Sequence, residues 1–363
     1  MFIPRSSITA LTQIAACTGL ICAFPTPALA QDADPPAATP EASAPALAPP
    51  APLAAPSTDP VATAPAASPE VAPAPDVTSA PPAAAKPKPP PYSLPWQLRP
   101  VAPGNVVRLD SSYAFYKNPG KPDHGHAFVS TLLGSYKILP DLAVIGRLGF
   151  VYNSPPDAIP DVPRKTNFLN PVLGGLYGIE LAPSLKLGLF LGVALPLGSG
   201  GTTNSLPSKR TATSVGISTR SAFDNAMFAV DYFTVFPGVD LAFVKAGFTL
   251  QGEATIFKLT RVRGTSDDSR VNLTMGVHAG YFITPFLSVG AELRHQRWLS
   301  TPATIKGKDA LRDTATFAVG PRFHFKFTDS MWFRPGVSLT VPLDDPMKKS
   351  DYTIVQLDLP LSF

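Results

Sequence analysis

The chain has 363 residues, carries a net charge of +4 at pH 7, and has only 15% charged residues. Globular proteins average about a quarter charged residues, so this chain is charge-poor. It has no Lys/Arg-rich run with interleaved aromatic residues, which argues against nucleic-acid binding. Beyond the N-terminus it has no run of about 18 apolar residues, which excludes a multi-helix membrane protein.

Residues 1–30 have the three parts of a secretory signal peptide. A positively charged start precedes a mostly apolar stretch at residues 8–24, and an A-x-A cleavage site stands at residues 28–30. The alternatives are an uncleaved anchoring helix and, because the residues around it resemble a lipobox, a lipidated Cys17. Both cysteines, Cys17 and Cys22, lie in this segment. Its cleavage would leave no disulfide, zinc–thiolate site or cysteine nucleophile.

A proline- and alanine-rich segment follows at residues 31–94. Residues 31–90 alone contain 18 prolines and 20 alanines. Such a composition cannot bury a core and favours extended polyproline II structure. We therefore expect a disordered linker, acting either as a periplasmic spacer or contact arm or as an extension without a partner.

From residue 95 onward the hydrophobic pattern has a period of two. The last stretch is the clearest, since Leu357, Leu359, Leu361 and Phe363 share one face and polar residues occupy the other. Segments of about ten residues with one apolar and one polar face are typical of a transmembrane β-barrel. The predicted strands are 105–116, 126–138, 142–153, 166–180, 185–197, 231–243, 246–262, 270–282, 286–299, 312–327, 331–343 and 350–363. The predicted fold is all-β, a 12-stranded antiparallel transmembrane barrel over residues 95–363 behind a disordered arm.

Short and long connections alternate along this pattern. The short turns are expected at residues 140–141, 182–184, 244–245, 284–285 and 328–330. Among the long connections, residues 198–230 are too many for a plain loop. Two interpretations stay open for this stretch. Residues 221–231 form a short helix that constricts the mouth, or strand six begins early, near Met227.

The sequence resembles the bacterial outer-membrane β-barrel (porin-like) superfamily, from the signal segment and residues 105–363. The most specific element is the C-terminal strand ending in Phe363, although Pro360 within it is unusual. The resemblance implies an outer-membrane location with the N-terminal arm in the periplasm, and contact with membrane lipid and lipopolysaccharide. It also implies recognition by the barrel-assembly machinery through Leu357, Leu359, Leu361 and Phe363.

Charged residues on the polar face are expected to line the lumen, because Arg or Lys facing lipid at mid-depth costs about 2–4 kcal/mol. The lumen candidates are Arg108, Asp110, Arg147, Asp240, Glu253, Glu292, Arg294, Arg322, His324 and Lys326. Arg294, Arg322, His324 and Lys326 would form a basic wall, which indicates either a preference for anionic solutes or a neutralised ionic belt. The leading hypothesis is a narrow channel for small polar or anionic solutes. The alternative is a structural or binding barrel with a filled lumen and ligand-contacting loops.

An enzyme is the least favoured hypothesis. The chain has no G-x-S-x-G, H-E-x-x-H or P-loop motif. A lipid-modifying enzyme of this superfamily would need a His and a Ser together on the outer face. We expect no catalytic residue, no metal site and no cofactor.

Overall fold

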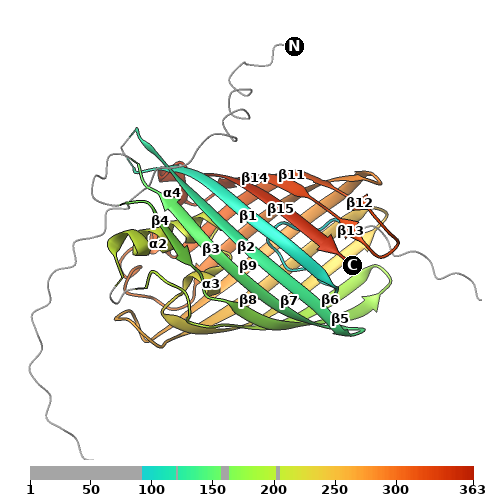
Figure 1. The fold of residues 1–363 in the computed structure, drawn as a ribbon, viewed down its shortest axis with the longest axis horizontal. Helices are drawn as coiled ribbons and strands as arrows, with labels where there is room; N and C mark the ends of the chain where they lie inside the picture. The colour runs from blue at the N-terminus through green and yellow to red at the C-terminus, as the bar shows by residue number, and fades with distance from the viewer. Residues whose placement is uncertain (1–91, 120–121, 157–162, 202–204) are drawn as a thin grey trace, which may run out of the picture. The chain divides into compact units, whose positions relative to one another are not determined.

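The computed structural model of the chain describes residues 92–119, 122–156, 163–201 and 205–363. The predicted signal peptide and almost all of the predicted Pro/Ala-rich linker lie outside these residues. The described chain forms a closed antiparallel barrel with twelve strand positions, as the sequence predicts (Figure 1). Its described helices include none that is long and apolar enough to cross a membrane.

The barrel wall is continuous because β1 pairs with β2 on one side and with β15 on the other. The strands are β1 (Val106–Lys117), β2 (His124–Leu139), β3 (Leu142–Ser154), β4 (Lys165–Phe168), β5 (Val172–Ala182), β6 (Leu185–Ala194), β7 (Tyr232–Lys245), β8 (Phe248–Arg261), β9 (Ser269–Thr284), β10 (Leu287–Trp298), β11 (Asp313–Phe323), β12 (Phe325–Lys326), β13 (Trp332–Phe333), β14 (Gly336–Pro342) and β15 (Thr353–Ser362). Three of the twelve wall positions are each occupied by two strands with a break between them. These are β4 with β5, β11 with β12, and β13 with β14.

The side chains alternate between the two sides of the wall. In β15, Gln356 and Asp358 are fully buried on the inside, whereas Leu357 is 45% exposed on the outside. Phe363, at the end of the same apolar face, is 49% exposed. The predicted assignment of the polar face to the lumen is therefore confirmed for this strand.

The turns gather at one end of the barrel, the short-turn end, and the longer connections gather at the other, the long-loop end (Figure 1). The turn predicted at residues 244–245 lies two residues later, at Ala246 and Gly247, which have φ angles of 50° and 81°. Two-residue hairpin turns need positive φ, and glycine supplies it without strain. The turn position is therefore set by Gly247.

The long connection before β7 contains two helices, α2 (Pro207–Thr219) and α3 (Asn225–Phe228). The helix predicted over 221–231 is wrong in extent. Ser221 and Ala222 have φ angles of 56° and 52°, which no helix accommodates, so only the four residues of α3 are helical in that range. The alternative of an early strand six is also wrong, since β7 begins at Tyr232. Two further short helices, η2 (Asp309–Leu311) and α4 (Asp345–Lys349), lie in later loops.

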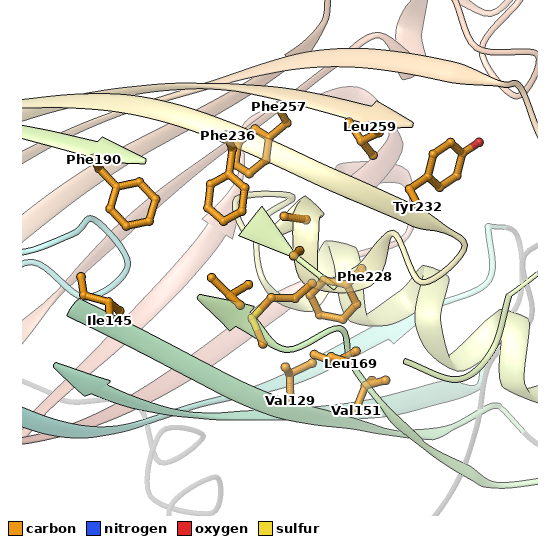
Figure 2. Packing of buried hydrophobic residues seen from close by; sticks show 14 of the residues in the cluster. Val129, Ile145, Val151, Leu169, Phe190, Phe228, Tyr232, Phe236, Phe257 and Leu259 are labelled. Atoms are coloured by element: carbon orange, nitrogen blue, oxygen red, sulfur yellow. The ribbon is translucent and has the colours of Figure 1, made fainter. Parts of the chain in front are cut away.

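One part of the lumen wall is apolar, contrary to the polar lining that alternation predicts. Inward side chains of β3 and β5–β8 form a buried hydrophobic cluster with residues of α3 (Figure 2). Its wall members include Ile145, Val172, Leu176, Phe190, Phe236 and Phe257. In β5 and β6 both faces carry apolar residues, so the sequence pattern does not reveal this lining.

Candidate functional site

A segment of the chain that precedes the barrel lies inside the lumen. We call residues 92–104 the plug. Trp96, Leu98 and Val101 of the plug are buried, with exposed fractions of 1%, 0% and 1%. The structure therefore places buried residues where the sequence predicts the boundary between linker and barrel.

Both ends of the plug lie near the short-turn end. The Ser93 backbone N–H donates to Thr249 Oγ1 at 3.0 Å, near the start of β8. The carbonyl of Gly104 accepts from Ser135 Oγ at 2.8 Å, near the end of β2. The middle of the plug reaches further in, where the Trp96 and Gln97 N–H groups meet Glu292. The plug is thus a loop that enters and turns back at the same end.

Wall carboxylates accept hydrogen bonds from plug backbone donors. Glu292 accepts from the N–H groups of Trp96 at 2.8 Å and Gln97 at 3.1 Å. Glu253 accepts from the Arg99 N–H at 2.7 Å. A buried segment without secondary structure must find partners for its backbone groups, and charged wall residues supply them here.

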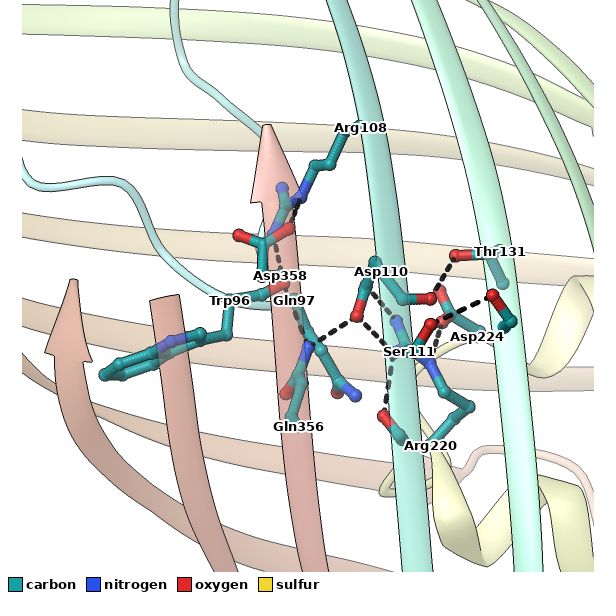
Figure 3. Close-up of polar contacts among 12 residues, drawn as sticks. Trp96, Gln97, Arg108, Asp110, Ser111, Thr131, Arg220, Asp224, Gln356 and Asp358 are labelled. Atoms are coloured by element: carbon teal, nitrogen blue, oxygen red, sulfur yellow. Dashed lines mark hydrogen bonds and ion pairs between the residues drawn. The ribbon is translucent and has the colours of Figure 1, made fainter. Parts of the chain in front are cut away.

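Wall arginines donate to the plug carbonyls. Arg322 donates to the carbonyl of Leu94 at 3.1 Å and to that of Pro95 at 3.2 Å. Arg108 also donates to the Pro95 carbonyl, at 3.0 Å, and both arginines are paired with Asp358, at 2.6 and 2.5 Å. Asp358 therefore holds two cations in place, and these cations hold the plug. Figure 3 shows the pair of Asp358 with Arg108.

Two glycines of the wall make room for the plug. A Cβ at Gly280 would lie 2.2 Å from Ser93 Oγ, and a Cβ at Gly276 would lie 2.7 Å from Leu98 Cδ1. The same Cβ at Gly276 would lie 3.1 Å from Phe223 in the loop before α3. Side chains at these positions would collide with what the lumen holds.

A second insert enters from the long-loop end. We call residues 205–231, which contain α2 and α3, the loop insert. Arg220, fully buried, donates to both carboxylate oxygens of Asp110, at 2.8 and 2.6 Å. Asp224 accepts from Arg147 at 2.5 Å and from Arg220 at 2.8 Å. Burial acts to raise the pKa of Asp224, but Arg147 and Arg220 outweigh it and hold that pKa below its ordinary value.

The two inserts meet the same wall residues. Gln356 donates to the Trp96 carbonyl of the plug at 3.2 Å and to Asp110 at 2.9 Å, and Asp110 binds Arg220 of the loop insert (Figure 3). The plug and the loop insert are thereby linked through two side chains of the wall.

A cavity of about 90 Å³ remains beside the plug. It is lined by Gly104 and Ser135 near the short-turn end, and by Asp224 and Met227 of the loop insert further in. Its apolar lining includes Leu133, Ile145, Val172, Leu176, Phe190, Phe236 and Phe257.

Most of the predicted lumen residues are buried among the inserts and the wall. These are Arg108, Asp110, Asp240, Glu253, Glu292, Arg294, Arg322 and His324. The side chain of Arg147 is 16% exposed. The side chain of Lys326 is 45% exposed at the short-turn end, where it pairs with Asp329.

The four predicted cations of the basic wall do not form one surface. Arg294 pairs with Glu292 at 2.5 Å, and Arg322 pairs with Asp358. His324 Nε2 lies 2.9 Å from Ser288 Oγ. With Lys326 outside the cluster, this arrangement favours the neutralised ionic belt over a wall selective for anions.

The outer face brings one His and one Ser opposite each other. His126 of β2 pairs in register with Ser154 of β3. Ser154 is fully buried, and neither its Oγ nor His126 Nδ1 has a hydrogen-bond partner. A base activates a serine through a hydrogen bond to its hydroxyl, so His126 does not activate Ser154 in this arrangement. Within the described ranges, no group of three His, Cys, Asp or Glu side chains is placed to hold a metal ion.

Comparison with known proteins gives similarity at the level of solved structures. No protein-family model and no curated protein matches the sequence. The chain is similar to an outer membrane channel from Pseudomonas putida F1, at 13% identity and a TM-score of 0.46, over 75% of this chain and 100% of that one. It is similar to the KdgM porin in complex with disordered oligogalacturonate, at 9% identity and a TM-score of 0.40, over 71% and 99%. It is also similar to the translocator domain of the autotransporter NalP from Neisseria meningitidis, at 10% identity and a TM-score of 0.39, over 74% and 90%.

Proposed function

We propose that the chain is an outer-membrane channel for small solutes and that the structure is its closed state. The outward face supports a place in lipid, since Leu148, Leu191 and Val277 are 60%, 58% and 48% exposed on the wall. In bacterial outer-membrane barrels the short turns face the periplasm. This proposal therefore places the plug's entry, and the predicted linker before it, on the periplasmic side.

The cavity beside the plug is the observation that carries the proposal. It extends from Gly104 and Ser135 to the loop insert, and we infer that it becomes part of a passage when the inserts move. Asp224, paired with Arg147 of the wall, stands at its inner limit. For a solute to pass, the loop insert would have to move and break this ion pair. The path would become wider if the plug also left the lumen.

Planar-bilayer conductance tests the channel. The full chain should be closed for most of the time. Asp224→Asn should raise the open probability at least tenfold, because Arg147 and Arg220 both lose the carboxylate of Asp224 and only Asp110 remains to pair with them. Asp313→Asn is the matched control, since Asp313 pairs with Arg297 on the exposed surface. If correctly folded Asp224→Asn protein gives no current, even after the plug is released, the lumen is permanently filled and the barrel is structural.

The proposal includes the predicted route of assembly. Leu357, Leu359 and Leu361 lie on the apolar face of β15, and Phe363 directly follows the strand. The barrel-assembly machinery would recognise these four residues. Lipopolysaccharide would contact the long-loop end, and the predicted linker would be free to contact a periplasmic partner.

A further inference from the structure

The cavity has an aromatic wall. The rings of Phe190 and Phe236 have centroids 5.6 Å apart, and those of Phe236 and Phe257 are 5.1 Å apart (Figure 2). All three rings line the cavity, together with aliphatic side chains of β2, β3 and β5. A flat aromatic molecule gains both apolar burial and ring–ring contact on such a surface.

The charged groups that line the cavity are paired with one another or with the wall. Arg147 and Asp110 bind the loop insert, and Arg108 binds Asp358. Arg99 pairs with Glu253 at 3.0 Å, and its guanidinium carbon lies 4.4 Å from the centroid of the Phe190 ring.

A charged ligand would therefore lose its water shell in the cavity and find each facing charge already engaged. Burial of an unpaired charge is strongly unfavourable. The lining selects against ions and favours a neutral molecule.

The size of the cavity sets the size of the ligand. Its volume is about 90 Å³. An engineered cavity of about 150 Å³, lined by Leu, Ile and Phe, binds benzene, and the two volumes are of the same order. One small ring is the corresponding occupant.

We propose that the cavity between the plug and strands β2–β8 is a binding site for neutral, single-ring aromatic molecules. This inference rests on the proposed channel, and it names such molecules as the solutes rather than the polar or anionic ones expected from the sequence.

Fluorine NMR titration of the full chain in detergent micelles tests the site, with fluorobenzene as the neutral probe and fluorobenzoate as the charged one. Val172→Phe would fill the cavity, because Val172 faces inward and lines it. Leu173→Phe is the matched control, since Leu173 is the next residue of β5 and is 51% exposed on the outside. Ala226→Leu fills the cavity from the loop insert and replaces Val172→Phe if that variant does not fold.

Saturable fluorobenzene binding is expected for the native chain and for Leu173→Phe, with affinity at least tenfold lower for the filled variant. Fluorobenzoate should bind the native chain at least tenfold more weakly than fluorobenzene. Equal fluorobenzene binding by native and filled proteins would overturn the proposal, since the probe would then be in the micelle. Tighter binding of fluorobenzoate would overturn it as well. Because binding needs no current, this failure is distinct from a failure of the channel in bilayers.

Discussion

Glu292→Gln tests whether the plug closes the lumen. The carboxylate of Glu292 is fully buried, and both of its oxygens face N–H groups. These donors are the backbone N–H groups of Trp96 and Gln97 and Nε of Arg294. In glutamine one oxygen becomes an NH₂ group, which faces a donor. At least one charge-assisted bond to the plug is lost and the other is weakened.

The size of the effect follows from these bonds. A hydrogen bond to a charged group contributes about 1.5–3 kcal/mol. A combined loss of about 2.8 kcal/mol in plug docking corresponds to roughly a hundredfold rise in the ratio of open to closed channels. Glu180→Gln is the control, because Glu180 is an exposed carboxylate of β5 with no plug contact among the described hydrogen bonds.

The assay is single-channel recording with a reversible lock on the plug. Ser93 and Ser288 have their hydroxyl oxygens 3.4 Å apart, so the Ser93→Cys/Ser288→Cys pair is close enough for a disulfide. Cys17 and Cys22 are replaced by serine in every variant. The oxidised lock should abolish the openings of Glu292→Gln, and reduction should restore them. Openings that persist in the oxidised protein, or folded Glu292→Gln protein that opens no more than Glu180→Gln, would refute the reasoning.

Three further outcomes are expected. The pKa of Asp224 is lowered in the folded chain, so its ion pairs are fully present above the ordinary pKa of about 3.9 and are lost only as the pH falls below that value. Conductance should therefore stay low from pH 7 to about pH 4 and rise at lower pH. Gly276→Ala should increase open probability about tenfold because its Cβ would displace Leu98, whereas Gly252→Ala, whose Cβ meets only a backbone atom at 4.0 Å, should not. Phe363→Ala should reduce the amount of assembled barrel in outer-membrane fractions severalfold while leaving synthesis unchanged.

Each of these outcomes has a clear opposite. Opening between pH 5 and 7 would assign the closure to a group other than Asp224. Equal effects of Gly276→Ala and Gly252→Ala would mean that the barrel, and not the plug, responds to the added methyl group. Normal assembly of Phe363→Ala would remove this residue from the assembly signal.

The barrel wall could be predicted because its signal is local. Most strands show an apolar and a polar face within about ten residues, as β15 does from Val355 to Ser362, and β5 and β6 are the exceptions. The predicted turn at 244–245 and the predicted helix over 221–231 were wrong, because a positive φ angle sets the turn at Gly247 and excludes a helix at Ser221. Neither a hydrophobic pattern nor a residue count reports a positive φ angle.

The contents of the lumen could not be predicted in the same way. The plug has no periodic pattern, and its partners are far away in the sequence: Trp96 contacts Glu292 across 196 positions, and Arg99 contacts Glu253 across 154. Two signals were present. Trp96 and Leu98 are large apolar residues directly after a proline-rich stretch, and β6 has apolar residues on both faces, which is typical of a strand buried on both sides.

The root of the plug lies at the seam of the barrel. The carbonyl of Asn105 accepts from the N–H of Phe363, and Asn105 Oδ1 accepts from the N–H of Lys137, so this residue joins the last strand to the second. The plug's partners, among them Glu253, Glu292 and Asp358, come from strands made late in synthesis. The plug precedes all of these strands in the chain, so its complete binding surface exists only once β15 has paired with β1 and the wall has closed.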